Sequence, residues 1–181
     1  MKLDPSRAVV LLVDVQERLS AAMPRDDLAR LVKYARALVG TARELGIPVL
    51  ATEQNPGGLG PTLPELRELL PAPPLEKMHF SCVADPRFAA ALEATHRRQV
   101  VIAGMETHVC VYLTARDLVV AGHDVHVCAD AVASRLELHR RSGLDLCRQA
   151  EAVVSTAETA IFDLLGQCGT PHFKRALALI K

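Results

Sequence analysis

The stretch Val100-Val-Ile-Ala-Gly-Met-Glu-Thr-His-Val-Cys110 contains the pattern that decides the fold. Its first four residues are apolar and three of them are β-branched, which is typical of a buried strand. Gly104 then suits a tight turn, and Thr107 suits the N-cap of a following helix. A strand that passes through a short turn into a helix is the building unit of an α/β fold with a parallel sheet.

The same alternation continues on both sides of this stretch and supports an α/β fold for the whole chain. The expected strands are residues 8–13, 47–52, 76–80, 99–103, 124–128 and 152–155; the expected helices are residues 28–45, 86–96, 108–121, 137–149, 157–165 and 171–180. The sequence contains no internal repeat, low-complexity tract or linker. We therefore expect one domain over residues 1–181, with a three-layer αβα, Rossmann-like fold and a mostly parallel six-stranded sheet.

One long irregular segment, residues 53–74, interrupts this alternation. It opens with Asn55-Pro-Gly-Gly-Leu-Gly-Pro61 and closes with Pro71-Ala-Pro-Pro74, around a short helical piece at residues 63–70. Because it follows an expected strand, it starts at the carboxyl edge of the sheet, where open α/β folds bind ligands. It is interpreted as a lid or binding loop, with a surface excursion as the alternative.

The composition excludes several classes of partner. Lys and Arg balance Asp and Glu at 21 each, so no general attraction to nucleic acid or anionic lipid is expected. The longest apolar run, residues 8–13, is too short to span a membrane and is followed by Asp14, which does not fit a signal peptide. Five cysteines without a C-x-x-C pair predict neither a disulfide framework nor a zinc site. We expect a cytoplasmic protein without a cofactor.

Cys110 and Asp14 are the candidates for chemistry. Cys110 falls in the first turn of the expected helix, where free backbone N–H groups and the helix dipole would lower the pKa of a thiol and receive an oxyanion. Asp14 ends the first apolar run. In a doubly wound sheet the first and fourth strands are neighbours, so base and nucleophile would share one crevice. Taken singly, the acid could be a cap and the cysteine a buried filler.

The other polar residues carry weaker signals. Spacing alone makes Lys77 a solvated lysine on an edge strand. The seven histidines form no H-E-x-x-H pattern, and only His108 lies next to the expected helix start, where an exposed first-turn residue is the simpler interpretation.

Three segments resemble the signatures of isochorismatase-like cysteine hydrolases, in the order of that family. They are Leu11-Leu-Val-Asp-Val-Gln16, the lysine before Phe80-Ser81, and Gly104-Met-Glu-Thr-His-Val-Cys-Val111. The resemblance covers nearly the whole chain. Within the superfamily, Thr52-Glu-Gln-Asn-Pro-Gly-Gly-Leu-Gly-Pro-Thr62 is most similar to the branch of isochorismatase-domain-containing proteins.

The resemblance implies a catalytic triad of Asp14, Lys77 and Cys110. Asp14 would accept the thiol proton, Cys110 would form a thioester with a carbonyl carbon, and Lys77 would keep Asp14 ionised. The backbone N–H groups of Glu106 and Cys110 would form the oxyanion hole, beside a cis peptide between Met105 and Glu106. The candidates for contact with a small-molecule substrate are Gln16, Gln54, Phe80 and Thr107.

Two departures narrow the expected substrate. Nicotinamidases of this superfamily bind a metal through one Asp and two His, but this chain has no His before His79 and no Asp between Asp27 and Asp85. We therefore expect no metal. True isochorismatases resemble this fold but lack the cysteine. The expected reaction is hydrolysis of a small amide, carbamoyl or related C–N compound.

Two other functions remain as alternatives. The first is a catalytically silent binding or scaffold protein that retains the fold. The second is a redox thiol protein in which Cys82 or Cys128 resolves an oxidised Cys110. In each case we expect a homo-oligomer, because the helices at residues 28–45 and 108–121 are apolar enough to bury one face against a second copy.

Overall fold

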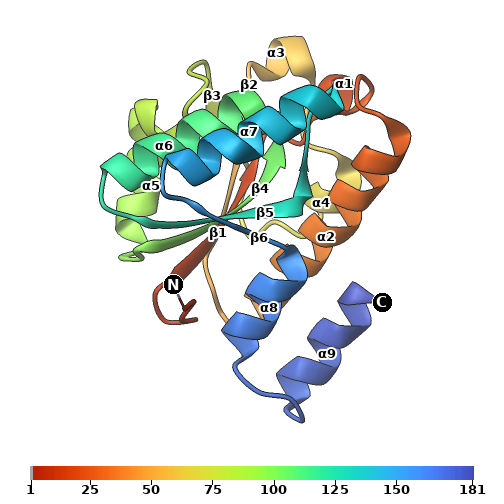
Figure 1. Ribbon diagram of the computed structural model, residues 1–181, viewed down its shortest axis with the longest axis vertical. Helices are drawn as coiled ribbons and strands as arrows, with labels where there is room; N and C mark the ends of the chain where they lie inside the picture. The colour runs from red at the N-terminus through yellow and green to blue at the C-terminus, as the bar shows by residue number, and fades with distance from the viewer. Residues whose placement is uncertain (1) are drawn as a thin grey trace.

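Six parallel strands form the central sheet of the computed structural model, which describes residues 2–181 (Figure 1). In spatial order they are β3 (Leu75–Lys77), β2 (Val49–Gln54), β1 (Ala8–Val13), β4 (Gln99–Met105), β5 (Asp124–Ala133) and β6 (Val153–Ser155). Every pairing between neighbours is parallel. The expected α/β fold is confirmed, and the described sheet is wholly rather than mostly parallel.

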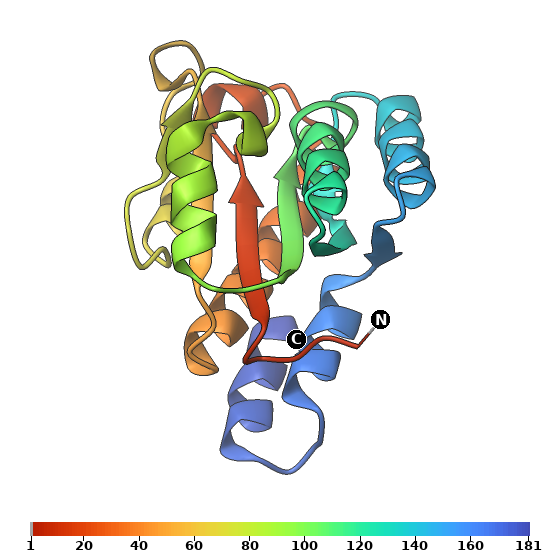
Figure 2. The same ribbon diagram turned by 90° about the vertical axis from the view of Figure 1, so that its left-hand side faces the viewer.

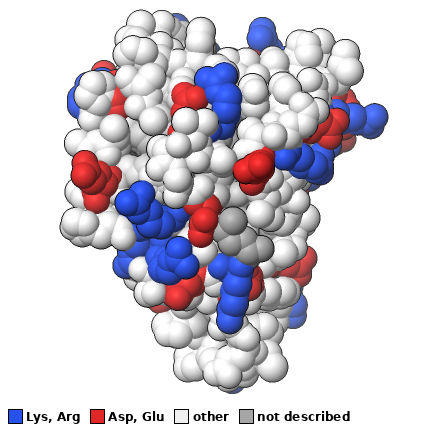
Figure 3. All heavy atoms as spheres, turned by 60° about the vertical axis from the view of Figure 1, so that its left-hand side comes forward, with Lys and Arg blue, Asp and Glu red and all other residues white. Residues whose placement is uncertain are grey.

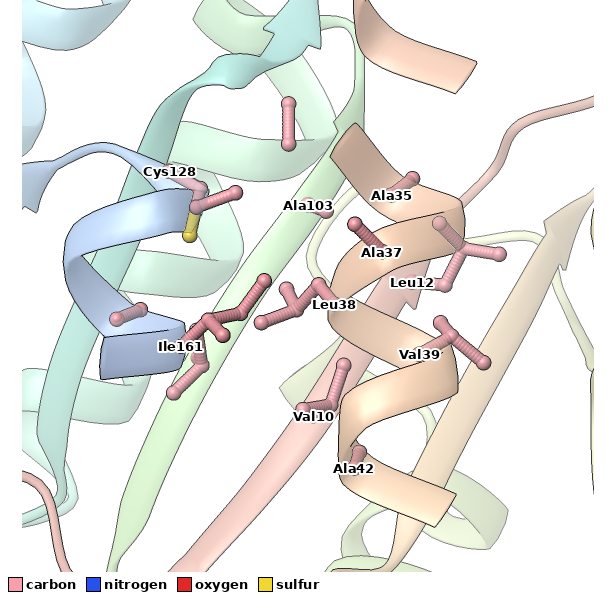
Figure 4. Close-up of a cluster of buried hydrophobic side chains, with 14 of the residues drawn as sticks. Val10, Leu12, Ala35, Ala37, Leu38, Val39, Ala42, Ala103, Cys128 and Ile161 are labelled. Atoms are coloured by element: carbon pink, nitrogen blue, oxygen red, sulfur yellow. The ribbon is translucent and has the colours of Figure 1, made fainter. Parts of the chain in front are cut away.

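Helices cover both faces of the sheet (Figures 1 and 2). On one face lie α2 (Arg25–Glu44) and α8 (Ala157–Leu165), with α9 (Pro171–Ile180) packed against α2; on the other lie α5 (Pro86–Ala94), α6 (Tyr112–Val120) and α7 (Glu137–Gln149). Figure 4 shows Leu38 of α2 and Ile161 of α8 pointing toward Val10 and Ala103 of the sheet. Because β1 is covered on both sides, all six of its residues are buried, as its unbroken apolar run predicts.

The end of the chain follows its local signals closely. Helix α8 stops at Gly166, whose φ of 70° is a left-handed conformation that favours glycine. Helix α9 begins with Pro171, and the Thr170 hydroxyl accepts a hydrogen bond from the Phe173 N–H. The predicted bounds of both helices are confirmed.

The predicted turn at Gly104 is wrong. Strand β4 continues through this residue, which has a φ of 132°, and a Cβ atom there would lie 2.1 Å from the carbonyl oxygen of Val13. Gly104 is therefore needed for the close approach of β4 to β1. The helix expected at residues 108–121 also begins differently, as a π-helical turn, η2 (Thr107–Val111), that leads into α6.

The segment at residues 53–74 packs more closely against the rest of the protein than a lid would. It contains α3 (Pro56–Leu59) and α4 (Pro64–Arg67), and it faces α1 (Glu17–Ser20) through an antiparallel bridge between Gln16 and Thr62. Leu66 of α4 is fully buried, and Arg36 of α2 donates a hydrogen bond to the Glu65 carbonyl at 2.6 Å. Its second half therefore packs against α2, and only the part around α3 stays at the sheet edge. In the part of the chain that is described, no helix is long and apolar enough to cross a membrane.

Candidate active site

The carboxyl edge of the sheet gathers the three predicted catalytic residues. Asp14 directly follows β1, Lys77 ends β3, and Cys110 lies in η2 just after β4. Strand β1 pairs with β2 on one side and β4 on the other, so this is the position where the chain reverses the direction in which strands are added. Asp14 has a left-handed backbone, with φ of 51°, as the chain leaves the sheet.

Asp14 is completely buried, and both of its carboxylate oxygens accept hydrogen bonds. The Lys77 ammonium donates to Oδ2 at 2.6 Å, and the Thr52 hydroxyl donates to Oδ1 at 2.7 Å. The side chains of Asp14 and Lys77 are 0% and 1% exposed, so their ion pair lies outside bulk water. Thr52 was not anticipated from the sequence, although its place at the carboxyl end of an expected strand next to β1 was the signal that could have found it.

Lys77 is not the solvated edge lysine that its spacing suggests. Its ammonium also donates to Gln54 Oε1 at 2.8 Å, and to the carbonyl oxygens of His79 at 3.2 Å and Phe80 at 3.3 Å. The three N–H donors of the ammonium are therefore all occupied. Burial is the largest influence and opposes the charged form, but Asp14, Cys82 and Cys110 together outweigh it and raise the pKa of Lys77.

Cys110 departs from the sequence expectation of a low pKa. Cys110 is 6% exposed, and burial, followed by the negative charge of Asp14, raises the pKa of its thiol well above the usual range. The expected N-cap is also absent, because the Thr107 hydroxyl donates to the Ala133 carbonyl at 3.0 Å and the turn is π-helical. Burial therefore favours the protonated form of the Cys110 thiol, which lies beside the Asp14 carboxylate.

The four candidate substrate-contact residues separate into two groups. Gln16 is fully buried, and its amide binds the Gln54 backbone and the Gly60 carbonyl. Thr107 is fully buried as well, and Gln54 is held between Lys77 and the Met78 carbonyl. These three side chains have hydrogen-bond partners within the chain, whereas Phe80 is 58% exposed beside the site.

A second polar cluster lies on the other side of η2, toward α7. His108 stacks on His139 with ring centroids 4.4 Å apart, and its Nδ1 lies 3.2 Å from the Ser134 hydroxyl. Burial lowers the pKa of His108, which is half-buried and not the exposed residue that its position suggests. Glu106 accepts hydrogen bonds from the backbone and guanidinium of Arg135, both at 3.1 Å. The peptide bond between Met105 and Glu106 is cis, where the resemblance predicts it.

The structure also distinguishes the remaining cysteines. Cys82 belongs to the same buried cluster as Cys110, whereas Cys128 lies on the opposite face of the sheet, with α2 and α8 (Figure 4). Of the two proposed resolving cysteines, only Cys82 shares the site. Among residues 2–181, no group of three or more His, Cys, Asp or Glu side chains is placed to hold a metal ion.

A family model described as the isochorismatase domain matches residues 8–159 of this sequence. The chain belongs to the isochorismatase family. It is 37% identical to isochorismatase domain-containing protein 2 of Bos taurus, over 98% of this chain and 84% of that protein. It is 36% identical to isochorismatase domain-containing protein 1 of Salmo salar, over 98% of this chain but only 62% of that longer protein.

Solved structures of other members of the isochorismatase family share the fold. A Caenorhabditis elegans protein described as the MAR1 ribonuclease superposes with a TM-score of 0.92 and 34% identity, over 99% of this chain and 92% of that one. YcaC from Pseudomonas aeruginosa gives a TM-score of 0.90 and 26% identity, over 98% and 91%. The Escherichia coli YcaC protein, described as an octameric hydrolase of unknown specificity, gives 0.86 and 31%, over 92% and 83%.

Proposed function

We propose that this isochorismatase-family hydrolase is a cysteine hydrolase that cleaves a small amide, carbamoyl or related C–N compound through a thioester on Cys110. The observation that carries the proposal is the buried ion pair of Asp14 and Lys77, 2.6 Å apart, next to a buried thiol. Buried ion pairs are often no more stable than apolar residues of the same volume. A pair retained beside a nucleophile is therefore better explained by chemistry than by stability.

The proposed reaction uses Asp14 to shuttle one proton in each of its two steps. Because the resting thiol is protonated, Asp14 takes its proton as Cys110 attacks the carbonyl carbon. Protonated Asp14 then gives this proton to the leaving nitrogen, the C–N bond breaks, and a thioester remains. Asp14 next removes a proton from water, which attacks the thioester; the C–S bond breaks, the acid leaves, and Asp14 returns the proton to the Cys110 sulfur. The backbone N–H groups of Glu106 and Cys110 stabilise the oxyanion in both steps.

Lys77 has an electrostatic role in this scheme. Its three donors already bind Asp14, Gln54 and the His79 and Phe80 carbonyls, so it has no proton left for the substrate. Its charge stabilises the ionised carboxylate on which the first step depends.

A relative gives independent support for a nucleophile in this fold. The Pseudomonas aeruginosa YcaC structure is described with covalent acrylamide. Acrylamide is an electrophile that alkylates thiolates, and it carries an amide group. By analogy, we propose that Cys110 is the residue of this chain that reacts with electrophiles of this size.

Two alternatives are tested alongside this proposal, a silent scaffold and a ribonuclease like the described Caenorhabditis elegans relative. Figure 3 shows basic and acidic side chains interspersed over one face, and the net charge of the chain is zero. Neither feature favours strong binding to a phosphate backbone.

The decisive experiment is a screen of small amides, carbamoyl compounds and imides, with acid quenching and mass spectrometry of the intact chain. We expect an acyl group that maps to Cys110 and product release that is lost in Cys110→Ala and reduced by a factor of at least about 100 in Asp14→Asn. Cys168→Ala, which removes the exposed thiol, serves as the control and keeps full activity. Activity should survive EDTA.

Turnover that persists in Cys110→Ala would overturn the nucleophile assignment. Cleavage of RNA by the parent and by Cys110→Ala alike, without turnover of any amide, would favour the ribonuclease. No turnover and no adduct across the panel would favour the scaffold.

We further propose that the protein is a homo-oligomer, as the octameric Escherichia coli relative is. Two apolar side chains, Val120 at the end of α6 and Leu138 in α7, are 83% and 73% exposed in the single chain. Light scattering should give a mass that is a multiple of 19.6 kDa. A monomer at micromolar concentration would contradict this proposal.

A further inference from the structure

Thr52 holds Asp14 at two points. It is the register partner of Val13, the residue before Asp14, and its backbone carbonyl accepts the Asp14 N–H at 3.1 Å. Its hydroxyl donates to Asp14 Oδ1 at 2.7 Å. Thr52 is 1% exposed, so no water competes for that carboxylate oxygen.

The direction of the hydrogen bonds around Thr52 follows from the single proton of its hydroxyl group. A threonine hydroxyl has one proton, and Thr52 gives it to the carboxylate. The Cys82 sulfur lies 3.7 Å from the same hydroxyl oxygen. Because the proton of Thr52 is already used, the Cys82 thiol must be the donor. A chain of donors therefore runs from the Cys82 S–H to the Thr52 O–H and on to Asp14.

We infer that Thr52, supported by Cys82, is a positioning residue that aims the carboxylate of Asp14 at the Cys110 thiol. The inference rests on the proposed function, in which Asp14 is the base. The terminal torsion of an aspartate is broad, so local packing alone does not fix the plane of its carboxylate. Thr52 binds Oδ1 while Lys77 binds Oδ2, and these two contacts fix that plane.

The Cys82 thiol is well suited to be the first donor in the series of hydrogen bonds that leads through Thr52 to Asp14. It is fully buried, and burial raises the pKa of Cys82 to about 11, so it remains a donor across the neutral range. Its backbone N–H donates to the Thr114 hydroxyl of α6 at 2.9 Å, which anchors it. Hydrogen bonds arranged in a chain polarise and strengthen one another.

The test compares Thr52→Val, which keeps the shape but loses the hydroxyl, with Thr52→Ser, which keeps the hydroxyl. The readout is the rate of Cys110 alkylation by iodoacetamide, resolved by peptide mass spectrometry between pH 6 and 10. At pH 6 we expect Thr52→Val to react at least about tenfold more slowly than the parent, and Thr52→Ser within about threefold of it. Once a substrate is known, kcat should fall in the same order with little change in KM.

The shape of the pH profile separates positioning from damage to the fold. Near pH 6 the thiol depends on Asp14 to remove its proton, whereas near pH 10 hydroxide can do so directly. The deficit of Thr52→Val should therefore shrink as the pH rises, while a distorted site would react slowly throughout. Thr41→Val is the matched control, because Thr41 is fully buried and its hydroxyl has no partner among the described residues. It should match the parent at every pH.

The remaining outcomes separate this inference from the proposed function. If Asp14→Asn turns over a substrate from the screen as fast as the parent, Asp14 is not the base and the proposed function fails. If Asp14→Asn loses turnover but Thr52→Val matches the parent in alkylation and turnover, only the role of Thr52 is overturned. Cys82→Ala should also slow the alkylation of Cys110 at pH 6, but by less than Thr52→Val does. A pH profile like that of the parent would show that Cys82 does not support Thr52. If Thr52→Val does not fold, the alkylation rates of Thr52→Ala and Thr52→Ser are compared instead, because only the serine keeps the hydroxyl.

Discussion

At the scale of single residues, Asp14 and Lys77 form an ion pair in which both side chains are buried. Each charge is removed from water and balanced chiefly by the other. Lys77→Met should therefore destabilise the fold by about 3–5 kcal/mol, because it leaves the Asp14 carboxylate buried without its cation. Urea unfolding of the two proteins measures this difference.

The double variant Asp14→Asn/Lys77→Met tests the cause of that loss. It removes both charges, so it should be more stable than Lys77→Met alone, although it has no base for catalysis. A double variant that is less stable than Lys77→Met would show that packing around the lysine, and not charge, is responsible.

At the scale of elements, the nucleophile is placed by contact between α7 and η2. A Cβ atom on Gly143 of α7 would lie 2.7 Å from the backbone nitrogen of His108 and from the carbonyl carbon of Thr107. Gly143 has no positive φ that would require glycine, so close packing is the reason for glycine at this position.

Gly143→Ala should destabilise the protein by about 1–3 kcal/mol, although alanine normally strengthens a helix. The added methyl group pushes α7 away from η2, so alkylation of Cys110 should slow as well. Thermal unfolding and peptide-resolved alkylation measure the two effects. Ser142→Ala, on the exposed side of the same helix, is the control and should change neither. A Gly143→Ala protein that is more stable than the parent would show that this contact can relax.

At the scale of the whole molecule, the buried thiols make stability depend on alkaline pH. Burial raises the pKa of Cys82 to about 11 and that of Cys147 to about 12, and it also raises the pKa values of Cys110 and Cys128. In the unfolded chain these thiols ionise near pH 8.5. Above that pH the unfolded state loses protons that the folded state keeps, so the free energy of unfolding must fall as pH rises.

We therefore expect the urea midpoint, measured under reducing conditions, to drop between pH 8 and pH 10. Each buried thiol contributes at most about 1.4 kcal/mol per pH unit. Cys128→Ala should show a shallower drop than the parent, whereas Cys168→Ala, which removes an exposed thiol, should show the same drop. Equal slopes in Cys128→Ala and the parent would contradict the role of burial.

Several features of this protein were fixed by local sequence. The apolar run of β1, the Gly166 stop and the Pro171 start act through neighbours in the chain, so the parallel α/β fold and the last two helices were predictable. The resemblance located Asp14, Lys77 and Cys110, and the fold brings their elements to one sheet edge.

Other features depended on residues that meet only in the folded chain. Burial, which no local pattern records, raises the pKa of Cys110 where its place near a helix start predicted the opposite. Gly104, where the sequence predicts a turn, belongs to strand β4 because it packs closely against β1. Thr52 lies next to Asp14 through strand pairing across 38 residues of sequence, so its hydrogen bond to the Asp14 carboxylate was decided by the tertiary structure.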